Sequence, residues 1–205
     1  MVTTNPREEF FDAVSKGDTS RVAGILSTNP QAVTWRYTAN GLDQPVTMIA
    51  HEAIMLQLLL EHKADPNAAD RVGDTRLIQC GDGGGTARLL LDYGAEIDKP
   101  NNAGLTPLMR AAFNHAVNVV KVLLEHGANP DLTDKDGKTA EAIAQGRSFH
   151  DVAAMIHDYA ETRHKEALMR ESENFHKGLD HKIQVARPLT MKNSGRQAPY
   201  FLALN

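Results

Sequence analysis

Apolar and polar positions recur along this chain with a long and nearly fixed period. Gly41, Gly73, Gly104 and Gly137 open four similar segments at intervals of 32, 31 and 33 residues. Each segment closes with a Leu-rich run that is followed by a turn containing Ala, Asn or Asp. A constant period of this length is typical of repeat architectures, in which stacked units share one continuous core. The pattern therefore predicts a row of similar units.

The clearest unit, residues 104–136, predicts two helices and a polar loop. Thr106 can cap free backbone amides, Pro107 suits a first helical turn, and Gly127 supplies a left-handed residue that ends a helix. Apolar residues at helical spacing mark one face of each helix: Leu108, Ala111, Ala112, Val117, Val120, Leu123 and Leu124. Neither helix can bury its face alone, so neighbouring units must cover it.

The same unit carries a specific family pattern. G-x-TPL-x-x-AA at 104–112, followed by VVKVLLEHGAN at 119–129, resembles the ankyrin repeat. Segments 41–72 and 73–103 resemble it more loosely, and Arg76 replaces the usual Pro. Residues 137–159 are similar to a terminal ankyrin unit, and an opening unit precedes Gly41 with Phe10, Phe11, Val14, Val22, Ile25 and Leu26 on its inward face.

The resemblance implies an all-α fold: a solenoid of stacked antiparallel helix pairs with β-hairpin-like finger loops. The array covers residues 6–159, as units 6–40, 41–72, 73–103, 104–136 and 137–159. The run Gly83, Gly84 and Gly85 lowers helix propensity, which predicts that the third unit is the least stable.

A different composition begins after the array. Residues 160–178 predict a C-terminal helical extension that Gly178 ends, and residues 179–205 predict an irregular tail broken by Pro188, Gly195 and Pro199. The tail ends in the apolar run YFLAL, so we expect residues 196–205 to pack on protein surface, their own or a partner's. Self-association through this tail is one alternative.

Charge narrows the classes of partner. Residues 1–160 carry 14 Lys and Arg against 21 Asp and Glu, whereas residues 161–205 carry 8 against 5. The acidic body repels phosphate backbones, so we expect no nucleic acid partner. No apolar run reaches membrane-spanning length, and MVTTNPREEFF lacks the basic start and apolar core of a secretory signal. A single cysteine excludes a disulfide framework, and these features together favour the cytoplasm.

Three features could carry chemistry. GDGGGTARLL at 81–90 is similar to a phosphate-binding loop, but it lacks Gly-Lys-Ser/Thr and a preceding strand, so a turn between helices is the preferred interpretation. His150, His157 and His164 recur every seven residues near Glu161, which keeps a metal- or ligand-binding C-terminal helix as the alternative function. Cys80 stands where the family has a small alanine, which indicates a buried and inert thiol.

We expect no cofactor and no catalysis, because thin repeat units offer no enclosed pocket.

The expected function is therefore non-enzymatic binding of a protein partner through the concave surface of fingers and inner helices. Adaptor, inhibitor, immunity-type and effector proteins all share this resemblance. By the resemblance, the variable positions that contact a partner are Tyr37, Asn40, Leu42, Arg71, Val72, Asp74, Asn102, Leu105, Phe113, Lys135, Asp136 and Lys138. Tyr, Arg and Phe are the residue types that most often anchor interfaces.

Overall fold

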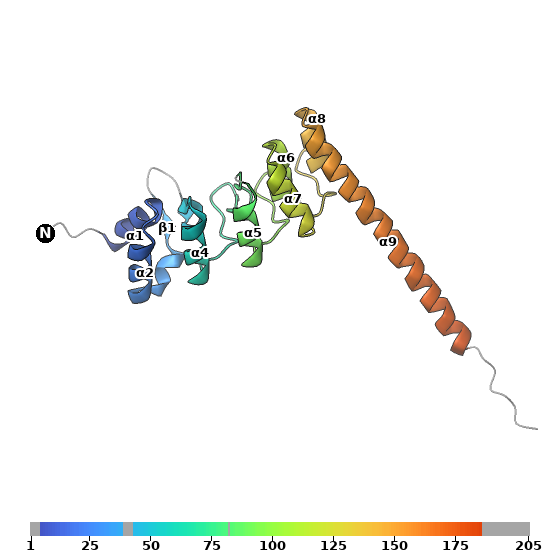
Figure 1. Ribbon diagram of the computed structural model, residues 1–205, viewed down its shortest axis with the longest axis horizontal. Helices are drawn as coiled ribbons and strands as arrows, with labels where there is room; N and C mark the ends of the chain where they lie inside the picture. The colour runs from blue at the N-terminus through green and yellow to red at the C-terminus, as the bar shows by residue number, and fades with distance from the viewer. Residues whose placement is uncertain (1–4, 39–42, 82, 186–205) are drawn as a thin grey trace, which may run out of the picture. The chain divides into compact units, whose positions relative to one another are not determined.

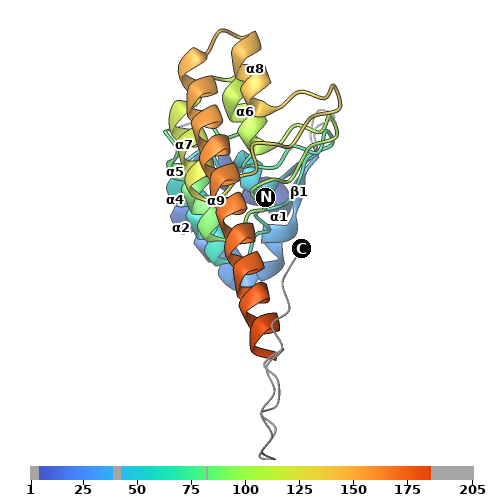
Figure 2. The ribbon, with the colours of Figure 1, turned by 90° about the vertical axis from the view of Figure 1, so that its right-hand side faces the viewer.

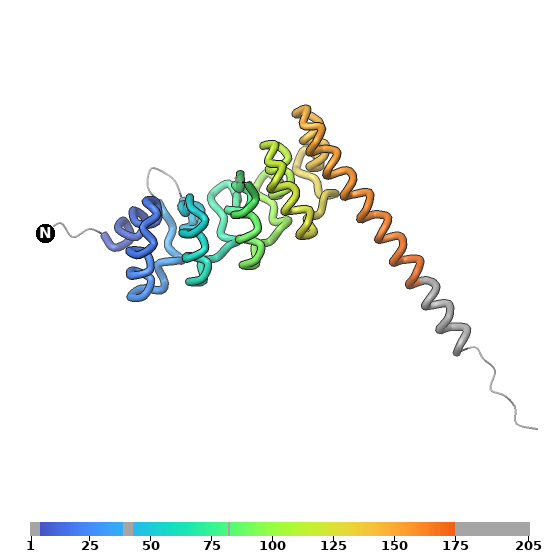
Figure 3. The backbone as a smooth tube through the Cα atoms, viewed as in Figure 1, coloured from blue at the N-terminus to red at the C-terminus, as the bar shows by residue number. Residues whose placement is uncertain are grey.

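Short helices arranged in pairs form the first part of this computed structural model (Figures 1 and 3). The structure describes residues 5–38, 43–81 and 83–185, with side chains described up to residue 174. The elements in chain order are α1 (Pro6–Ser15), α2 (Thr19–Thr28), the 3-10 helix η1 (Pro30–Thr34), β1 (Arg36–Tyr37), β2 (Gln44–Pro45), α3 (Val46–Ile49), α4 (Ala53–Glu61), α5 (Gly85–Asp92), α6 (Pro107–Phe113), α7 (Val117–Glu125), α8 (Ala140–Gly146) and α9 (His150–Val185). The chain divides into two units at Thr162, and the helix pairs lie in the first.

Within residues 5–162 the helices stack in sequence order. α1 packs on α2 and α3, α4 on α2 and α5, and α6 on α7 and α8. Figure 2 shows α2, α4, α5 and α7 in one row, with the loops on the opposite side of α6 and α8. The predicted all-α solenoid of helix pairs is therefore confirmed, and the pairing of β1 with β2 makes the first finger a hairpin (Arg36 opposite Pro45).

One hydrophobic core runs through all of these pairs. Buried apolar side chains form a single cluster from Phe10 in α1 to Ile156 in α9. Of the residues predicted to face inward in the first unit, Ile25 alone is only half-buried, and the other five are buried. Since each unit buries its apolar face against the next unit, the units depend on their neighbours for stability.

The caps of the fourth unit form as predicted. The Thr106 hydroxyl accepts a hydrogen bond of 3.3 Å from the Met109 amide, and Pro107 is the first residue of α6. α7 ends at Glu125 with His126 as its C-cap, and Gly127 follows with φ +88°. These local signals fix both helix ends, which is why the sequence located them correctly.

The ends of the outer helices share one geometry, although one unit lacks the usual glycine. Lys63 occupies the position that Gly94 and Gly127 hold in the next two units, and its φ is +69°. Its amide bonds to the Leu60 carbonyl at 2.9 Å, as the Gly127 amide bonds to Leu124 at 3.0 Å. Lys63 is thus held in a left-handed conformation that costs a non-glycine residue about 1 kcal/mol or more.

The third unit departs from the helix-pair plan. Residues 76–79 form turns where the other units have an inner helix, and the Gln79 amide bonds back to the Thr75 carbonyl at 3.3 Å. Arg76, in the place of the usual Pro, has a buried Nε for which no hydrogen-bond partner lies among the described residues. Cys80 is buried as predicted, and its thiol donates to the Arg76 carbonyl at 3.4 Å.

The last helix is longer than the sequence predicts. Gly178 does not end it, because α9 runs without interruption from His150 to Val185. A single glycine inside a helix costs only about 1 kcal/mol relative to Ala. The following residues, LDHKIQV, contain no Pro and continue the helix. The boundary predicted at 178 is therefore wrong by seven residues. The predicted docking of residues 196–205 lies outside the described part of the chain.

Candidate protein-binding groove

Three finger loops repeat the same hydrogen bonds. We define the fingers as residues 70–74, 101–105 and 134–138. Each begins with Asp or Asn, and that side chain's Oδ1 accepts from two backbone amides of its own finger, at 2.9 to 3.0 Å. The fingers also bond to one another, since the Asn102 amide donates to the Val72 carbonyl at 3.0 Å and the Lys135 amide to Ala103 at 3.2 Å. Their backbone conformation is consequently fixed.

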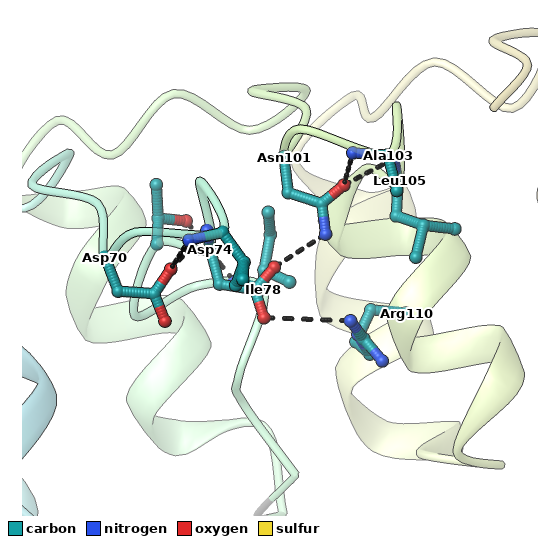
Figure 4. A network of polar contacts seen from close by, with 9 residues as sticks. Asp70, Asp74, Ile78, Asn101, Ala103, Leu105 and Arg110 are labelled. Carbon is teal, nitrogen blue, oxygen red and sulfur yellow. Dashed lines mark hydrogen bonds and ion pairs between the residues drawn. The ribbon is translucent and has the colours of Figure 1, made fainter. Parts of the chain in front are cut away.

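A buried polar network ties the first two of these fingers to α6 (Figure 4). Asp74 is only 7% exposed. Its Oδ1 accepts a hydrogen bond of 2.7 Å from the Asn101 side-chain amide, and its Oδ2 lies 3.7 Å from the Arg110 guanidinium. Asp74 therefore holds the scaffold together. The expectation that it contacts a partner is not supported by this geometry, because neighbouring groups already occupy both of its oxygens.

A groove of about 470 Å³ opens between the fourth and fifth units. Its lining residues come from the fingers at 101–105 and 134–138, from α6, and from α8 with the residue after it. They are Leu105, Arg110, Phe113, Asp134, Asp136, Lys138, Ala142, Ile143, Gly146 and Arg147. The packing of α6 against α8 places these residues side by side. The groove thus combines an apolar floor with charged edges, as partner-binding surfaces do.

An arginine stacks on aromatic rings at one end of the groove. The Arg147 guanidinium carbon lies 4.1 Å from the centre of the Phe113 ring and 5.4 Å from that of Phe149. Phe149 also stacks on His115 with ring centres 4.4 Å apart, and Nε2 of His115 lies 2.9 Å from both carboxylate oxygens of Asp151. This contact lowers the pKa of Asp151, chiefly through the hydrogen bond from His115. Phe113 is 42% exposed and carries the Arg147 guanidinium over its ring.

The groove collects four of the predicted contact residues, Leu105, Phe113, Asp136 and Lys138. Lys135 is exposed next to it in the same finger. The remaining predictions fall on other parts of the structure. Arg71, Val72 and Asn102 are exposed in the fingers at 70–74 and 101–105, Tyr37 is half-buried in β1, and Asn40 and Leu42 lie outside the described residues.

Two of these residues are already engaged within the protein. The Tyr37 ring packs edge-on against Phe11 with ring centres 5.5 Å apart, so it also closes the core of the first unit. The Asn102 side chain donates to the Arg71 carbonyl at 3.0 Å and joins neighbouring fingers.

Sequence reasoning missed the residues contributed by the terminal unit. Ala142, Ile143, Gly146 and Arg147 line the groove, as does Arg110 of the fourth unit. The period offered a signal, because Gly146 stands 33 residues after Phe113 and Arg147 follows it directly. The sequence analysis identifies residues 137–159 as a terminal unit and places Lys138 alone of them in the binding surface.

The histidine series does not assemble into a metal site. His150 and His157 lie on the continuous helix α9, where a spacing of seven residues separates two positions by about 10.5 Å along the axis. One ion cannot contact both imidazoles at normal ligand distances. Instead, Nδ1 of His157 lies 3.4 Å from Glu141. In the described residues, no three His, Cys, Asp or Glu side chains gather closely enough to hold an ion. The metal-binding alternative is therefore not supported.

The glycine-rich loop has a packing role. Gly84, with φ +92°, precedes α5, and a Cβ at this position would lie 3.0 Å from the Asn118 carbonyl oxygen and 3.1 Å from Val122 of the next unit. Close approach between units explains the glycine, in agreement with the preference for a turn over a phosphate site. Among the residues described, no helix is both long and apolar enough to span a membrane.

Stacked helix pairs with linked fingers and an open groove define a solenoid of the protein-binding class. The family described as ankyrin repeats (3 copies) matches residues 46–134 and, again, residues 80–166, more than half of the chain. The chain therefore belongs to the ankyrin-repeat family. Ankyrin repeats are generally protein–protein interaction modules and are typically non-enzymatic.

Three relatives illustrate how widely the repeat occurs. The ankyrin repeat protein YahD of Escherichia coli K12 is 30% identical over 119 residues, which cover 54% of this chain and 59% of YahD. The E3 ubiquitin-protein ligase XBAT34 of Arabidopsis thaliana is 35% identical over 49% of this chain and 28% of its own length. Dauer abnormal formation protein 25 of Caenorhabditis elegans is 27% identical over 85% of this chain and 37% of its own. The chain thus spans less than two thirds of each.

Proposed function

We propose that this protein acts by binding another protein through the groove between its fourth and fifth units. One observation carries the proposal: an exposed aromatic ring, Phe113, stands beside an apolar floor on a backbone that the finger bonds hold rigid. Aromatic anchors at the centre of a preformed surface supply much of the energy of protein association, and rigidity lowers the entropy lost on binding.

We propose that the protein acts as an adaptor or an inhibitor, because binding alone is sufficient for either role. An adaptor or an inhibitor needs no chemistry of its own, and both fit a groove that is open to solvent. A single buried thiol, Cys80, is also compatible with the reducing cytoplasm that we propose as its location.

The test compares two exposed aromatic residues. Phe113→Ala removes the proposed anchor, whereas Tyr93→Ala removes a ring of similar exposure, 38% against 42%, at the end of the outer helix α5. Purified wild type and both variants, each with its helical content checked by circular dichroism, are immobilised and exposed to lysate of the native host. Captured proteins are quantified by mass spectrometry.

We expect a protein that wild type and Tyr93→Ala retain and that Phe113→Ala loses. A hot-spot truncation typically costs 2 kcal/mol or more in binding free energy. If both variants retain the same partner, the interface lies outside the groove. Tyr37→Ala is unsuitable as a probe, because loss of its contact with Phe11 also disturbs the first unit.

A further inference from the structure

Arg147 differs from the other cations that line the groove. Asp74 lies 3.7 Å from Arg110, and Asp136 lies 3.9 Å from Lys138. Arg147, by contrast, forms no ion pair with a carboxylate in the described part of the chain. Its guanidinium contacts the Phe113 and Phe149 rings. Its charge is therefore available to a bound molecule.

The two aromatic rings also position the guanidinium. A guanidinium that contacts aromatic rings retains N–H groups for other partners, and these match the two oxygens of a carboxylate. The aromatic contact replaces part of the water around the cation, which reduces the cost of removing the rest on binding.

The two acids that line the groove, Asp134 and Asp136, have other contacts among the described residues. Oδ1 of Asp134 accepts hydrogen bonds from the Asp136 and Lys138 amides, both at 2.9 Å. Asp136, whose side chain is 77% exposed, is the acid next to Lys138 at the finger. The end of the groove at Arg147 thus offers a guanidinium next to the apolar side chains of Phe113 and Ile143.

We infer that the groove recognises a protein segment in which an apolar side chain is followed closely by Asp or Glu. The apolar side chain occupies the floor between Leu105 and Ile143, and the carboxylate pairs with Arg147. This inference rests on the proposed function, because it names the chemistry of the partner for the same groove.

A displayed library of random dodecapeptides, selected against the full chain, tests the inference. We expect enrichment of peptides that carry an apolar residue within a few positions of Asp or Glu. For the tightest one, changing its acid to the amide should weaken binding to wild type about tenfold, as loss of a charged hydrogen bond does. The same peptide change should alter binding to Arg147→Gln less than twofold.

The outcomes separate the two proposals. If the effects of Arg147→Gln and of the peptide amide simply add, or if basic or uncharged motifs are enriched, Arg147 does not read a carboxylate and the inference is overturned while binding in the groove stands. If the selected peptides bind Phe113→Ala as tightly as wild type, the groove itself is not the binding site and the proposed function fails. Arg147→Glu is the second variant, since selection against it should enrich Lys or Arg in place of the acid.

Discussion

The Asn101 side-chain amide donates a hydrogen bond of 2.7 Å to Oδ1 of Asp74, and this bond joins two successive fingers. Asp74 lies in the finger at 70–74 and Asn101 begins the finger at 101–105. Because Oδ1 of Asn101 also accepts from the Ala103 and Leu105 amides, the amide group of Asn101 supports both its own finger and the preceding one. This network also positions part of the groove, because Leu105 bonds to Asn101, Arg110 pairs with Asp74, and both residues line the groove.

Asp74→Ala should lower the free energy of unfolding by about 1–3 kcal/mol, the usual cost of leaving buried partners without a hydrogen bond. It strands the Asn101 amide and removes the only acid paired with Arg110 within the described residues. Urea unfolding followed by circular dichroism measures the change. Asp136→Ala is the control, because its side chain is 77% exposed and should alter stability by less than about 0.5 kcal/mol. Equal effects of the two substitutions would contradict the structural role of Asp74.

Lys63→Gly should stabilise the protein by about 0.5–1 kcal/mol, because it relieves a left-handed backbone conformation at φ +69°. Gly127→Lys tests the same position in the fourth unit, at φ +88°, and should destabilise the protein. Thermal unfolding of both variants measures the opposite shifts in Tm. Shifts of the same sign would show that the side chains, and not the backbone conformation, control stability at these positions.

The third unit should be the first part of the array to open, since turns at 76–79 replace an inner helix. Hydrogen exchange of amides 76–92 should accordingly be faster than that of α6 and α7. Slower exchange there than in the fourth unit would overturn this prediction.

A glycine pair tests the packing of that unit. Gly84→Ala should destabilise by more than about 1 kcal/mol, because its Cβ meets Asn118 at 3.0 Å and its φ is +92°. Gly83→Ala has open space around its Cβ and should be neutral or slightly stabilising. Unfolding curves of the two variants compare them directly.

The sequence predicted the helix pairs from two kinds of signal. The caps act within about four residues of the chain, and the apolar pattern repeats from unit to unit. Thr106, Pro107 and Gly127 each act on adjacent turns, and each was placed correctly. Gly178 was misjudged, since one breaker residue does not outweigh helix-forming neighbours on both sides.

The site was harder to predict because it depends on contacts between distant residues. Phe113 could be named from its family position, but its stacking on Arg147 joins residues 34 positions apart in sequence. Asp74 was predicted to contact a partner because it lies in a finger. Its burial follows from Asn101 and Arg110, which the fold brings to it from 27 and 36 residues away. The repeated Asp70, Asn101 and Asp134, each three residues before a glycine, were a readable signal of the finger bonds.

Asp43 should make the stability of the first finger depend on pH. The Arg36 guanidinium donates to Oδ1 of Asp43 at 2.6 Å, and this hydrogen bond lowers the pKa of the Asp43 carboxyl below its ordinary value. A carboxyl whose pKa is lower in the folded state stabilises the protein above its unfolded pKa of about 3.9, and this contribution is lost as the pH falls through the folded pKa. Arg36 also donates to the Ala69 carbonyl at 2.9 Å, so the ionised pair connects the β1–β2 hairpin to the residue that precedes the finger at 70–74.

Asp43→Asn should therefore destabilise the protein at pH 7, and the difference from wild type should shrink as the pH falls below about 4. Urea unfolding at pH 7, 5, 4 and 3 measures this difference. Asp136→Asn, at an exposed carboxylate, is the matched control for changing an acid to an amide. A difference between Asp43→Asn and wild type that stays constant from pH 7 to pH 3 would show that the Arg36 pair does not stabilise the ionised form. A difference that grows as the pH falls would reverse the sign of the argument, since it would require a carboxyl that is more easily protonated in the folded protein than in the unfolded chain.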